Sequence, residues 1–539
     1  MVILSPQHVV CVALGLVASL ANATASASSA SEGPQAHNRT AADCPDYNKY
    51  AQEPHAPYSD GPLRLPYMRP SEECRTFTSP AVEKVIEDMK ARLKNPDLAR
   101  LFENTFPSTL DTTVKYFDLT ANLAFIITGV SGVMVQSSKD AQWLRDTGNQ
   151  FAHLYKLLPQ DENLKNLVKA VINTEARYIY QFPYCGSFQP PPESGLKPSH
   201  NDYADNVRIN PPVDNQTVFE CKYELDSLAG FLKISRSYYE NTNDPSFIND
   251  NCKSTANTSV NVRRKAMQTI LELLRDQSQG SWSDDWEFVS YYNWTGTAGS
   301  LSPPVTNGGN GEPKLANGLV GSSHRPSDDL CVFNFITSDN AMISVELNLV
   351  ADVLEKIGAE EQLAGHARRF SGIIKKAVWD NTRTNNGIFA YETNGYGGMY
   401  IMDDANVPSL LSLPYLGFLP RNDSTYMKTK DAMLSRMNPY YAEGKSFKGV
   451  GGPHVNATYP WPMSQVSAIF GTDDDDEITA RLALIMENTS GLGLIHESIH
   501  IYNASDYTRP WFAWANSYFA EMVLDLAERK PSLIFEKDE

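Results

Sequence analysis

Apolar residues recur at helical spacing in stretch after stretch of this chain, from residue 79 almost to the C-terminus. One apolar stripe occupies residues 342–354 and ends at Gly358, and the next occupies residues 363–377. A helix is expected to begin at Ser79-Pro80, because serine caps helix N-termini and proline suits the first turn. Further helices are predicted at residues 141–158, 160–182, 220–241, 260–277, 425–437, 473–488 and 511–528, and from weaker patterns at 115–130, 405–418 and 461–470.

Strand-like stretches are few and short, such as residues 387–392, so about a dozen helices dominate the expected structure. Because strands do not alternate with helices, the pattern argues against a parallel α/β sheet. Paired helices can form a closed ring or an open solenoid, and a solenoid would show a fixed sequence period, which this chain lacks. We therefore predict an all-α toroid with minor short strands. Loops at one end of such a ring build the pocket, so the long irregular stretch at residues 294–327 is expected to serve the site.

The composition of the 539 residues is that of a globular protein, with 42% hydrophobic and 20% charged residues. The formal net charge of -18 and the isoelectric point near 5.1 argue against nucleic acid and anionic membrane surfaces as partners. The chain contains no long block of Lys or Arg that would offset this balance.

The first residues have the pattern of a targeting segment. Residues 9–20 are an apolar run that is too short to cross a membrane, which takes ~20 residues, and small residues follow it. We interpret residues 1–27 as a cleaved signal peptide, residues 28–78 as a polar N-terminal extension and residues 79–539 as the helical domain. The mature protein is therefore expected in the secretory pathway or outside the cell, with no membrane partner after cleavage.

Sequons and cysteines agree with export. Six cysteines remain after residue 27, an even number that suits disulfides in an oxidising compartment. Cys44 and Cys74 are placed to pin the extension, whereas Cys221 and Cys331 are expected as free packed thiols. The absence of C-x-x-C spacing argues against a structural zinc site. Eight N-x-S/T sequons after residue 27 predict a glycosylated chain, at Asn38, Asn215, Asn257, Asn293, Asn422, Asn456, Asn488 and Asn503.

Trp143, Arg145 and Asp146 stand together in the stretch WLRD at the start of a predicted helix. The simplest interpretation is an amphipathic helix with an Arg145–Asp146 pair on its surface. A sugar site is the functional alternative, because an aromatic face packs on pyranose C–H groups while Arg and Asp bind adjacent hydroxyls.

Adjacent aspartates occur at residues 328–329 and 403–404, each pair just before an apolar run. Either pair could simply supply a helix cap. For the first pair we expect a division of roles. Ser327 and one aspartate start a helix, and the other aspartate projects into a pocket.

His496, Glu497 and His500 match the zinc-peptidase spacing H-E-x-x-H. That motif requires a helix, whereas Gly491, Gly493 and the surrounding β-branched residues favour an extended chain. A Ser-His-Asp hydrolase is disfavoured as well, because the chain has no G-x-S-x-G. What remains is carboxylates in loops rich in Trp, Tyr, Arg and Asn, which suits glycoside hydrolysis by two carboxyl groups.

Seven motifs in order along the chain carry a resemblance: WLRDTGNQ (143–150), KYELDSL (222–228), RPSDD (325–329), MDDANVPSLLSLPYLG (402–417), NPYY (438–441), HES (496–498) and TRPWFAWANSYFAE (508–521). They resemble glycoside hydrolase family 125, from about residue 80 to about residue 529. The resemblance implies a metal-independent exo-α-1,6-mannosidase with an (α/α)6 toroid and no cofactor. Its implied partner is a mannose-containing oligosaccharide or glycoprotein glycan.

The resemblance also implies an inverting mechanism with an aspartate as general acid and a glutamate as general base. The acid is Asp328 or Asp329, which the sequence does not distinguish, and the base is Glu497. No metal ligand is implied. Residues implied to hold the terminal mannose or to wall its pocket are Trp143, Arg145, Asp146, Arg325, Asp404, Asn406, His454, Trp461, His496 and Trp511.

Two other classes of function stay open at this point. One is a different (α/α)6 glycosidase, such as a glucoamylase-like or trehalase-like enzyme. The other is a catalytically inactive mannan-binding protein, although the presence of both candidate carboxylates argues against it.

Overall fold

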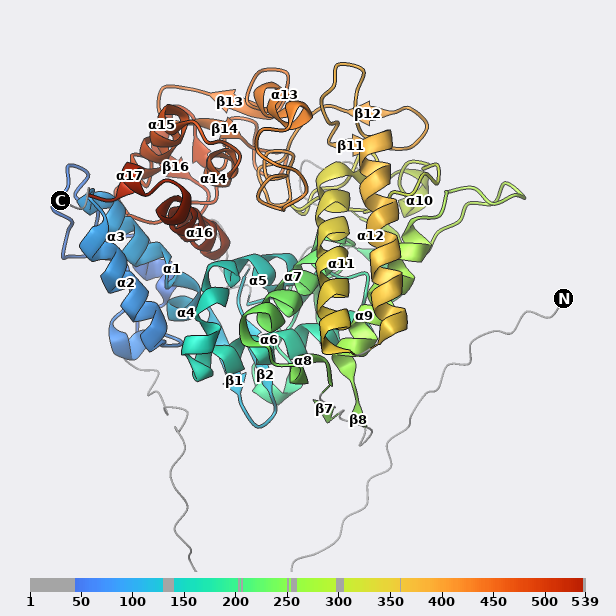
Figure 1. Ribbon diagram of the computed structural model, residues 1–539, viewed down its shortest axis with the longest axis horizontal. Coiled ribbons are helices and arrows are strands. Elements are labelled where there is room, and N and C mark those ends of the chain that lie inside the picture. Colours follow the sequence, from blue (N-terminus) through green and yellow to red (C-terminus); the bar gives the residue numbers. More distant parts are fainter. Residues whose placement is uncertain are drawn as a thin grey trace, which may run out of the picture. The chain divides into compact units, whose positions relative to one another are not determined.

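Paired helices form a ring in this protein (Figure 1). The computed structural model describes residues 44–128, 140–201, 204, 207–249, 252–253, 259–296, 305–358 and 360–536. Helix α5 contacts α7, α7 contacts α11, α14 contacts α16, and α16 contacts α5. These inner elements are α5 (Leu144–Gln150), α7 (Leu225–Thr242), α11 (Thr337–Ile357), a segment of turns at residues 403–418, α14 (Pro462–Phe470) and α16 (Ala513–Arg529).

Outer helices pack behind inner ones, as α6 behind α7, α12 behind α11, α15 behind α14 and α3 behind α16. Figure 1 shows α11 and α12 side by side in yellow, and α2 and α3 in blue beside α16 in red. The arrangement is the all-α (α/α)6 toroid, so the predicted fold class is confirmed. The outer helices are α2 (Pro80–Arg92), α3 (Pro96–Thr105), α6 (Glu162–Gln181), α9 (Val262–Gln277), α12 (Glu361–Asn381), α13 (Ser424–Met433) and α15 (Asp475–Met486).

Local sequence signals set the ends of several helices. The Ser79 hydroxyl accepts a hydrogen bond from the Val82 N–H, and the Asp161 carboxylate accepts one from the Leu164 N–H, so each caps a helix N-terminus. Gly358 ends α11 with φ of 66°, which glycine adopts without steric cost. The start at Ser79, the stripe before Gly358 and the helix within residues 461–470 are confirmed.

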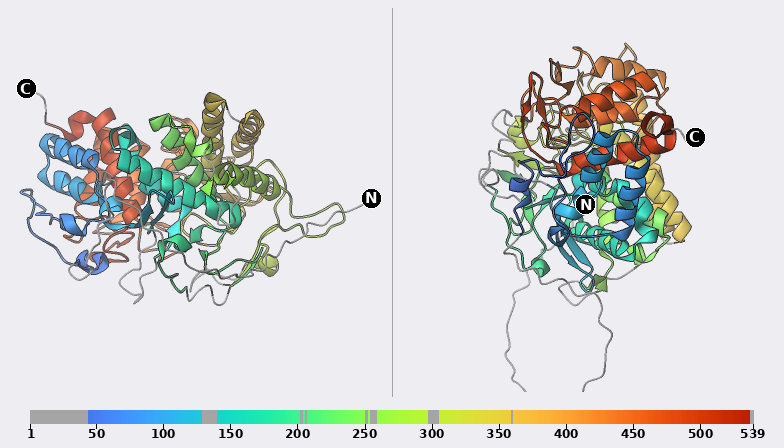
Figure 2. Two further views of the ribbon diagram at one scale, coloured as in Figure 1. Left: turned by 90° about the horizontal axis from the view of Figure 1, so that it is seen from below. Right: turned by 90° about the vertical axis from the view of Figure 1, so that its left-hand side faces the viewer.

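Short elements connect the helices. Figure 2 (left) shows the helices on one side of the molecule and most of the irregular connections on the other. The short helices are α1 (Tyr47–Tyr50), α4 (Ser108–Thr112), α8 (Ser246–Asn249), α10 (Thr306–Gly309) and α17 (Pro531–Ile534), with 3-10 helices at Glu72–Cys74, Ala152–Gln160 and Pro192–Ser194. The antiparallel strands pair as β1 (Val114–Asp118) with β2 (Leu123–Ile126), β3 (Gln142–Trp143) with β4 (Ser187–Phe188) and β6 (Val218–Glu220), β5 (Arg208–Asn210) with β9 (Asn293–Thr295), β7 (Cys252–Lys253) with β8 (Ser259–Val260), β10 (Phe335–Ile336) with β11 (Glu392–Thr393) and β12 (Met399–Tyr400), β13 (Tyr441–Glu443) with β14 (Lys448–Val450), and β15 (Ile499–His500) with β16 (Asn503–Tyr507).

Two of the weaker helix predictions are wrong. The described part of residues 115–130 contains the hairpin of β1 and β2. Residues 405–418 form turns, because Pro408 and Pro414 lack backbone donors and the Asp403 carboxylate accepts the N–H groups of Leu410 and Leu411.

The expected helix start at Ser327 is also wrong. Residues 324–330 form a tight turn that is closed by a bridge between His324 and Leu330, and α11 begins only at Thr337. Ser and Asp favour turns for the same reason that they favour caps, since their side chains bond to nearby backbone groups.

Residues 45–78 lie in the same compact unit as the helices, Pro45–Glu539. Ala51, Leu65 and Met68 are buried, and Cys44 and Cys74 are each disulfide-bonded. The predicted signal peptide lies outside the described residues. Within the described ranges, no helix combines the length and the apolar character that a membrane crossing demands.

Candidate active site

The N-terminal ends of inner helices converge on one cavity of ≈ 360 Å³. Trp143 precedes α5, Trp461 precedes α14 and Phe512 precedes α16, so the ring brings these aromatic side chains together. Helix N-termini carry partial positive charge, which favours carboxylates at this end of the ring. The cavity is lined by Trp143, Arg145, Asp146, Pro326, Ser327, Asp328, Asn406, His454, Trp461, Glu497, Arg509, Phe512 and Trp514.

Asp328 reaches this cavity from the turn before α11. Its backbone has φ of 69°, a left-handed conformation that costs energy in a residue other than glycine. Its N–H donates to the Arg325 carbonyl (2.9 Å), and the Arg325 N–H donates to the Asp329 carbonyl (2.7 Å). The turn therefore separates the two aspartates and directs Asp328 towards Arg145.

Arg145 gathers four carboxyl groups around one buried guanidinium. Its Nε lies 3.1 Å from Asp146, its Nη2 3.2 Å from Asp328, and its Nη1 3.1 Å from Glu224 and 3.6 Å from Asp226. All of these side chains are at most 6% exposed except that of Asp328, which is 20% exposed. Asp328 is thus the most exposed member of the cluster.

Burial and crowding raise most pKa values in this cluster. Burial and the charge of Asp328 raise the pKa of Asp146 to about 6 and that of Asp226 to about 7, although Arg145 acts in the opposite direction. Burial likewise raises the pKa of Glu224. For Asp328 burial is outweighed, because the Lys222 and Arg145 cations and a hydrogen bond from Glu224 lower its pKa.

Glu497 faces the same cavity from the loop before β15. Its Oε1 lies 3.2 Å from Arg509 Nε, and its Oε2 accepts a hydrogen bond from the Thr508 hydroxyl at 2.8 Å. These contacts fix the carboxylate, which is 4% exposed as a residue. The two carboxylates therefore reach the cavity from different elements, Glu497 from the loop before β15 and Asp328 from the turn before α11.

The zinc-motif spacing at Glu497 lies on a loop and strand, as the sequence predicts, and not on a helix. His496 stacks on Tyr507 with ring centroids 4.0 Å apart, and its Nδ1 lies 2.9 Å from the carbonyl oxygens of Arg509 and Pro510. His496 therefore supports the loop that carries Glu497 and does not line the cavity.

Asp329 lies on the other side of the turn and lines a second cavity, of ≈ 990 Å³, with Arg325, Tyr400 and Tyr440. Its carboxylate accepts a hydrogen bond from the Ser327 hydroxyl (3.1 Å) and lies 3.6 Å from His454 Nδ1.

Carboxylates around His454 favour its positively charged form. Burial disfavours the charge, but the hydrogen bond with Asp329 and the charges of Glu497 and Asp328 raise the pKa of His454 to about 9. The imidazolium lies between the first cavity, which it lines, and the second.

Besides His496, three residues that the resemblance implied at the pocket do not line this cavity. The Arg325 guanidinium is buried against Glu392 at 2.6 Å, and Asp404 is buried where it accepts a hydrogen bond from the Ser327 hydroxyl at 2.6 Å. Trp511 does not line the cavity, because its indole N–H donates to Ser108. Trp143, Arg145, Asp146, Asn406, His454 and Trp461 do line it.

Sequence reasoning did not single out Glu224, Asp226, Arg509, Phe512 or Trp514. All five stand inside the motifs KYELDSL and TRPWFAWANSYFAE, so the available signal was their place in those motifs. A carboxylate one residue before a helix resembles an ordinary cap, which concealed Glu224.

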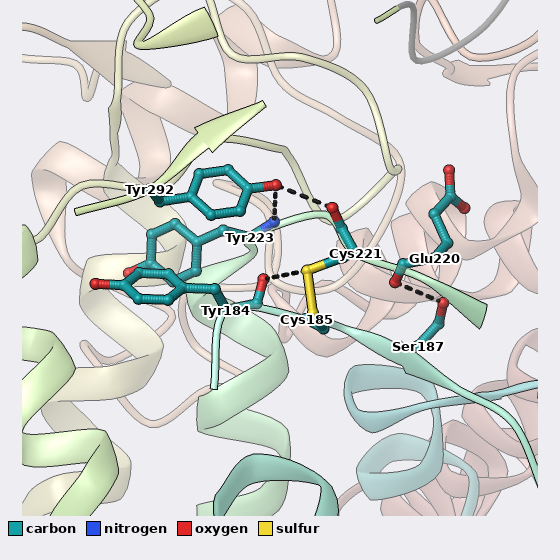
Figure 3. Close-up of a disulfide and its surroundings, with 7 residues drawn as sticks. All are labelled: Tyr184, Cys185, Ser187, Glu220, Cys221, Tyr223 and Tyr292. Atoms are coloured by element: carbon teal, nitrogen blue, oxygen red, sulfur yellow. Dashed lines mark hydrogen bonds between the residues drawn. A yellow bond between two sulfur atoms is a disulfide. The ribbon is translucent and has the colours of Figure 1, made fainter. Parts of the chain in front are cut away.

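A disulfide fixes the segment that enters α7. Cys221 is bonded to Cys185, so the expectation of a free thiol at Cys221 is wrong, whereas Cys331 is free as predicted. Tyr292 donates to the Cys221 carbonyl at 2.9 Å and accepts from the Tyr223 N–H at 3.3 Å (Figure 3). The cross-link and this tyrosine hold the backbone immediately before Glu224.

Comparison with known proteins decides the family. A family model for "Metal-independent alpha-mannosidase (GH125)" matches residues 95–524. The chain belongs to glycoside hydrolase family 125. It is therefore a glycoside hydrolase of the α-mannosidase type, and the alternative of a glucoamylase-like or trehalase-like enzyme is rejected.

Two relatives show how far the similarity extends. The Meiotically up-regulated gene 157 protein of Schizosaccharomyces pombe is 42% identical over 501 residues, which cover 91% of this chain and 94% of that protein. A structure from work on metal-independent alpha mannosidases, a Streptococcus pneumoniae non-productive substrate complex with alpha-1,6-mannobiose, has 26% identity and a TM-score of 0.73. That similarity covers 84% of this chain and 99% of the pneumococcal chain.

Proposed function

We propose that the protein is a secreted, inverting exo-α-1,6-mannosidase that removes terminal mannose from N-glycans or mannoproteins. The observation that carries this proposal is that Asp328 and Glu497 reach one cavity from different elements. The lining combines aromatic side chains with a few polar and charged groups, which suits a terminal sugar ring.

Asp328 is the proposed general acid and Glu497 the proposed general base. In an inverting reaction the acid protonates the leaving oxygen, and the base removes a proton from the water that attacks the opposite face of the sugar. Asp328 is assigned over Asp329 because only Asp328 lines the cavity together with Glu497. Arg145 and Arg509 hold the two carboxylates in place.

The aromatic lining supports a sugar substrate. Trp143, Trp461 and Phe512 offer apolar faces to ring C–H groups, while Asn406 and His454 offer polar groups for hydroxyls. The α-1,6 linkage is proposed because the similar pneumococcal structure holds α-1,6-mannobiose.

Export and glycosylation are part of the proposal. The Cys185–Cys221 disulfide supports folding in an oxidising compartment. Among the described sequon asparagines, Asn215, Asn422, Asn456 and Asn503 are exposed.

The test is hydrolysis of α-1,6-, α-1,3- and α-1,2-mannobiose by the purified protein, with and without EDTA. We expect only the 1,6 isomer to be cleaved, at a rate that EDTA leaves unchanged. The variant Asp328→Asn should lose ~10²–10⁴-fold in kcat, the usual contribution of general acid catalysis. An Asp328→Asn variant with wild-type turnover contradicts the assignment, and the same loss confined to Asp329→Asn would transfer the acid role. Absence of turnover with every isomer would instead favour a mannan-binding protein.

A further inference from the structure

The charges around Arg145 do not balance. One guanidinium contacts Asp146, Glu224, Asp226 and Asp328, and all four carboxyl groups are mostly or fully buried. If all four were ionised, the cluster would carry three more negative charges than Arg145 neutralises, and Lys222 and His454 offset them only at Asp328. Protonation of some of these buried carboxyl groups at neutral pH relieves this cost.

Glu224 is placed to share such a proton with Asp328. Its Oε2 lies 3.1 Å from Arg145 Nη1 and accepts a hydrogen bond from the Ser227 hydroxyl at 3.0 Å. Its Oε1 is fully buried and receives no N–H or hydroxyl hydrogen bond from the described residues. Glu224 and Asp328 contact the two Nη atoms of the same guanidinium, at 3.1 and 3.2 Å, which places their carboxyl groups side by side where they can share a hydrogen bond. Two carboxyl groups can form such a bond only when one of them is protonated.

We propose that Glu224 is a positioning residue that holds, in the free enzyme, the proton that Asp328 delivers to the glycosidic oxygen. The inference rests on the proposed function and deepens it by naming the source of the acid's proton. It also accounts for a general acid that stands beside two cations, a position that by itself favours the ionised form.

The proton transfer balances as follows. The Glu224 O–H bond breaks as an Asp328 O–H bond forms, and Asp328 then protonates the glycosidic oxygen while its bond to the anomeric carbon breaks. Glu497 removes a proton from the attacking water as the new carbon–oxygen bond forms. After product release, Glu497 returns its proton to solvent, and the pair of Glu224 and Asp328 takes one up.

Other titratable groups bias this shared proton. Asp146 on α5 and Asp226 on α7 raise carboxyl pKa values in the cluster, and Asp226 also raises that of Asp339 on α11; all three have raised pKa values of their own. The cations Lys222, which pairs with Glu220 at 2.9 Å, and His454 favour ionised Asp328. The neutral partner of Asp328 is therefore expected to be the fully buried Glu224, because the cations face Asp328.

The backbone leaves Glu224 little freedom. A Cβ atom at Gly186 would lie 2.7 Å from Glu224 Oε2, so glycine there permits the close approach of the carboxyl group. The Leu225 N–H donates to the Ser322 hydroxyl, and the disulfide at Cys221 fixes the preceding residues. The pair is thus preorganised before substrate binds.

The experiment compares pH profiles of kcat for wild type and Glu224→Gln on two substrates. One is α-1,6-mannobiose, whose leaving group needs a proton, and the other is a dinitrophenyl α-mannoside, whose leaving group does not. The glutamine amide can donate to Asp328 but cannot release a proton, so it locks Asp328 in the ionised form. In Glu224→Gln we expect the alkaline limb of the kcat–pH profile to move to lower pH by about one unit or more. The loss of kcat should be ~10²-fold or more on mannobiose and far smaller on the dinitrophenyl substrate.

Glu175→Gln is the matched control. Glu175 on α6 is another fully buried glutamate, and burial raises its pKa to about 8. It accepts a hydrogen bond from Gln142 and does not line the cavity. Its variant should keep the wild-type profile. Equal losses of Glu224→Gln on both substrates, or an unmoved alkaline limb, would overturn the inference.

Folding and function can be separated in this test. If Glu224→Gln fails to fold, infrared spectra of the wild type and Asp328→Asn replace it, because removal of the partner should shift the carboxylic C=O band of Glu224. An unshifted band overturns the inference. Failure of the wild type to cleave α-1,6-mannobiose would contradict the proposed function, whereas an active wild type with an unchanged Glu224→Gln profile contradicts this inference alone.

Discussion

Replacement of Arg145 by methionine tests the charge cluster at the centre of the site. Methionine has a similar length and apolar stem but leaves four carboxyl groups with no guanidinium between them. Removal of one partner from a buried ion pair costs about 3–5 kcal/mol, so we expect the free energy of unfolding to fall by at least that amount at about pH 7.5.

The loss should shrink as the pH falls. Without Arg145 the folded-state pKa values of Asp146 and Asp226, already raised, rise further above their values in the unfolded chain, and the low pKa of Asp328 rises as well. A carboxyl group with a raised folded pKa binds more protons folded than unfolded, so its presence lowers stability as pH rises. Each extra proton changes the free energy of unfolding by about 1.4 kcal/mol per pH unit. With two or three such groups, most of the deficit should vanish between about pH 7.5 and about pH 5.5.

Urea denaturation of wild type and Arg145→Met across this pH range measures the effect. Arg325→Met is the control, because Arg325 is equally buried but pairs with Glu392 alone. In Arg325→Met, Glu392 keeps hydrogen bonds from the Val332 and Phe333 N–H groups. The free energy of unfolding of this variant, relative to wild type, should therefore change with pH by the equivalent of at most one proton. Two results would refute the claim that several carboxyl groups around Arg145 take up protons when it is removed. One is a loss in free energy of unfolding of Arg145→Met that does not depend on pH, and the other is a loss that changes with pH no more steeply than that of Arg325→Met.

Three further outcomes are expected. Serine at both Cys185 and Cys221 should lower the free energy of unfolding by about 4 kcal/mol, because the bridge spans 36 residues, and an unchanged urea midpoint would contradict this. Burial lowers the pKa of Lys314 to about 7, so the folded protein binds fewer protons there than the unfolded chain up to about pH 10.5. Wild-type stability relative to Lys314→Met should therefore rise from about pH 7 to about pH 10, and parallel pH curves would disagree. Peptide mass mapping of protein from a glycosylating host should find a glycan on exposed Asn503 but none on Asn488, which is 7% exposed and donates to Leu484.

Amphipathic helices were the part of the fold most accessible from sequence. The prediction of 260–277 matches α9 (Val262–Gln277) closely, since the periodicity and the Asn261 cap are local signals. Residues 405–418 failed because their apolar spacing is helical while Pro408 and Pro414 cannot supply helical donors. Tertiary packing buries that segment as turns, which no local signal specifies.

The candidate site was only partly accessible. Glu497 and Asp328 were identified through motifs, but the choice between Asp328 and Asp329 required the turn geometry that sends them to different cavities. Glu224 was missed because its importance depends on Arg145, which a distant helix supplies. Contacts of this kind between separate motifs arise only when the ring closes.

The configuration of the first-formed sugar tests the central claim most directly, that Asp328 and Glu497 act as acid and base across one cavity. Proton NMR of α-1,6-mannobiose during the first minutes of hydrolysis distinguishes the anomers before they equilibrate. We predict β-mannose first, followed by slow conversion to the equilibrium mixture, and no β-mannose from Glu497→Gln. Initial release of α-mannose would contradict the inverting mechanism and the roles assigned to both carboxylates.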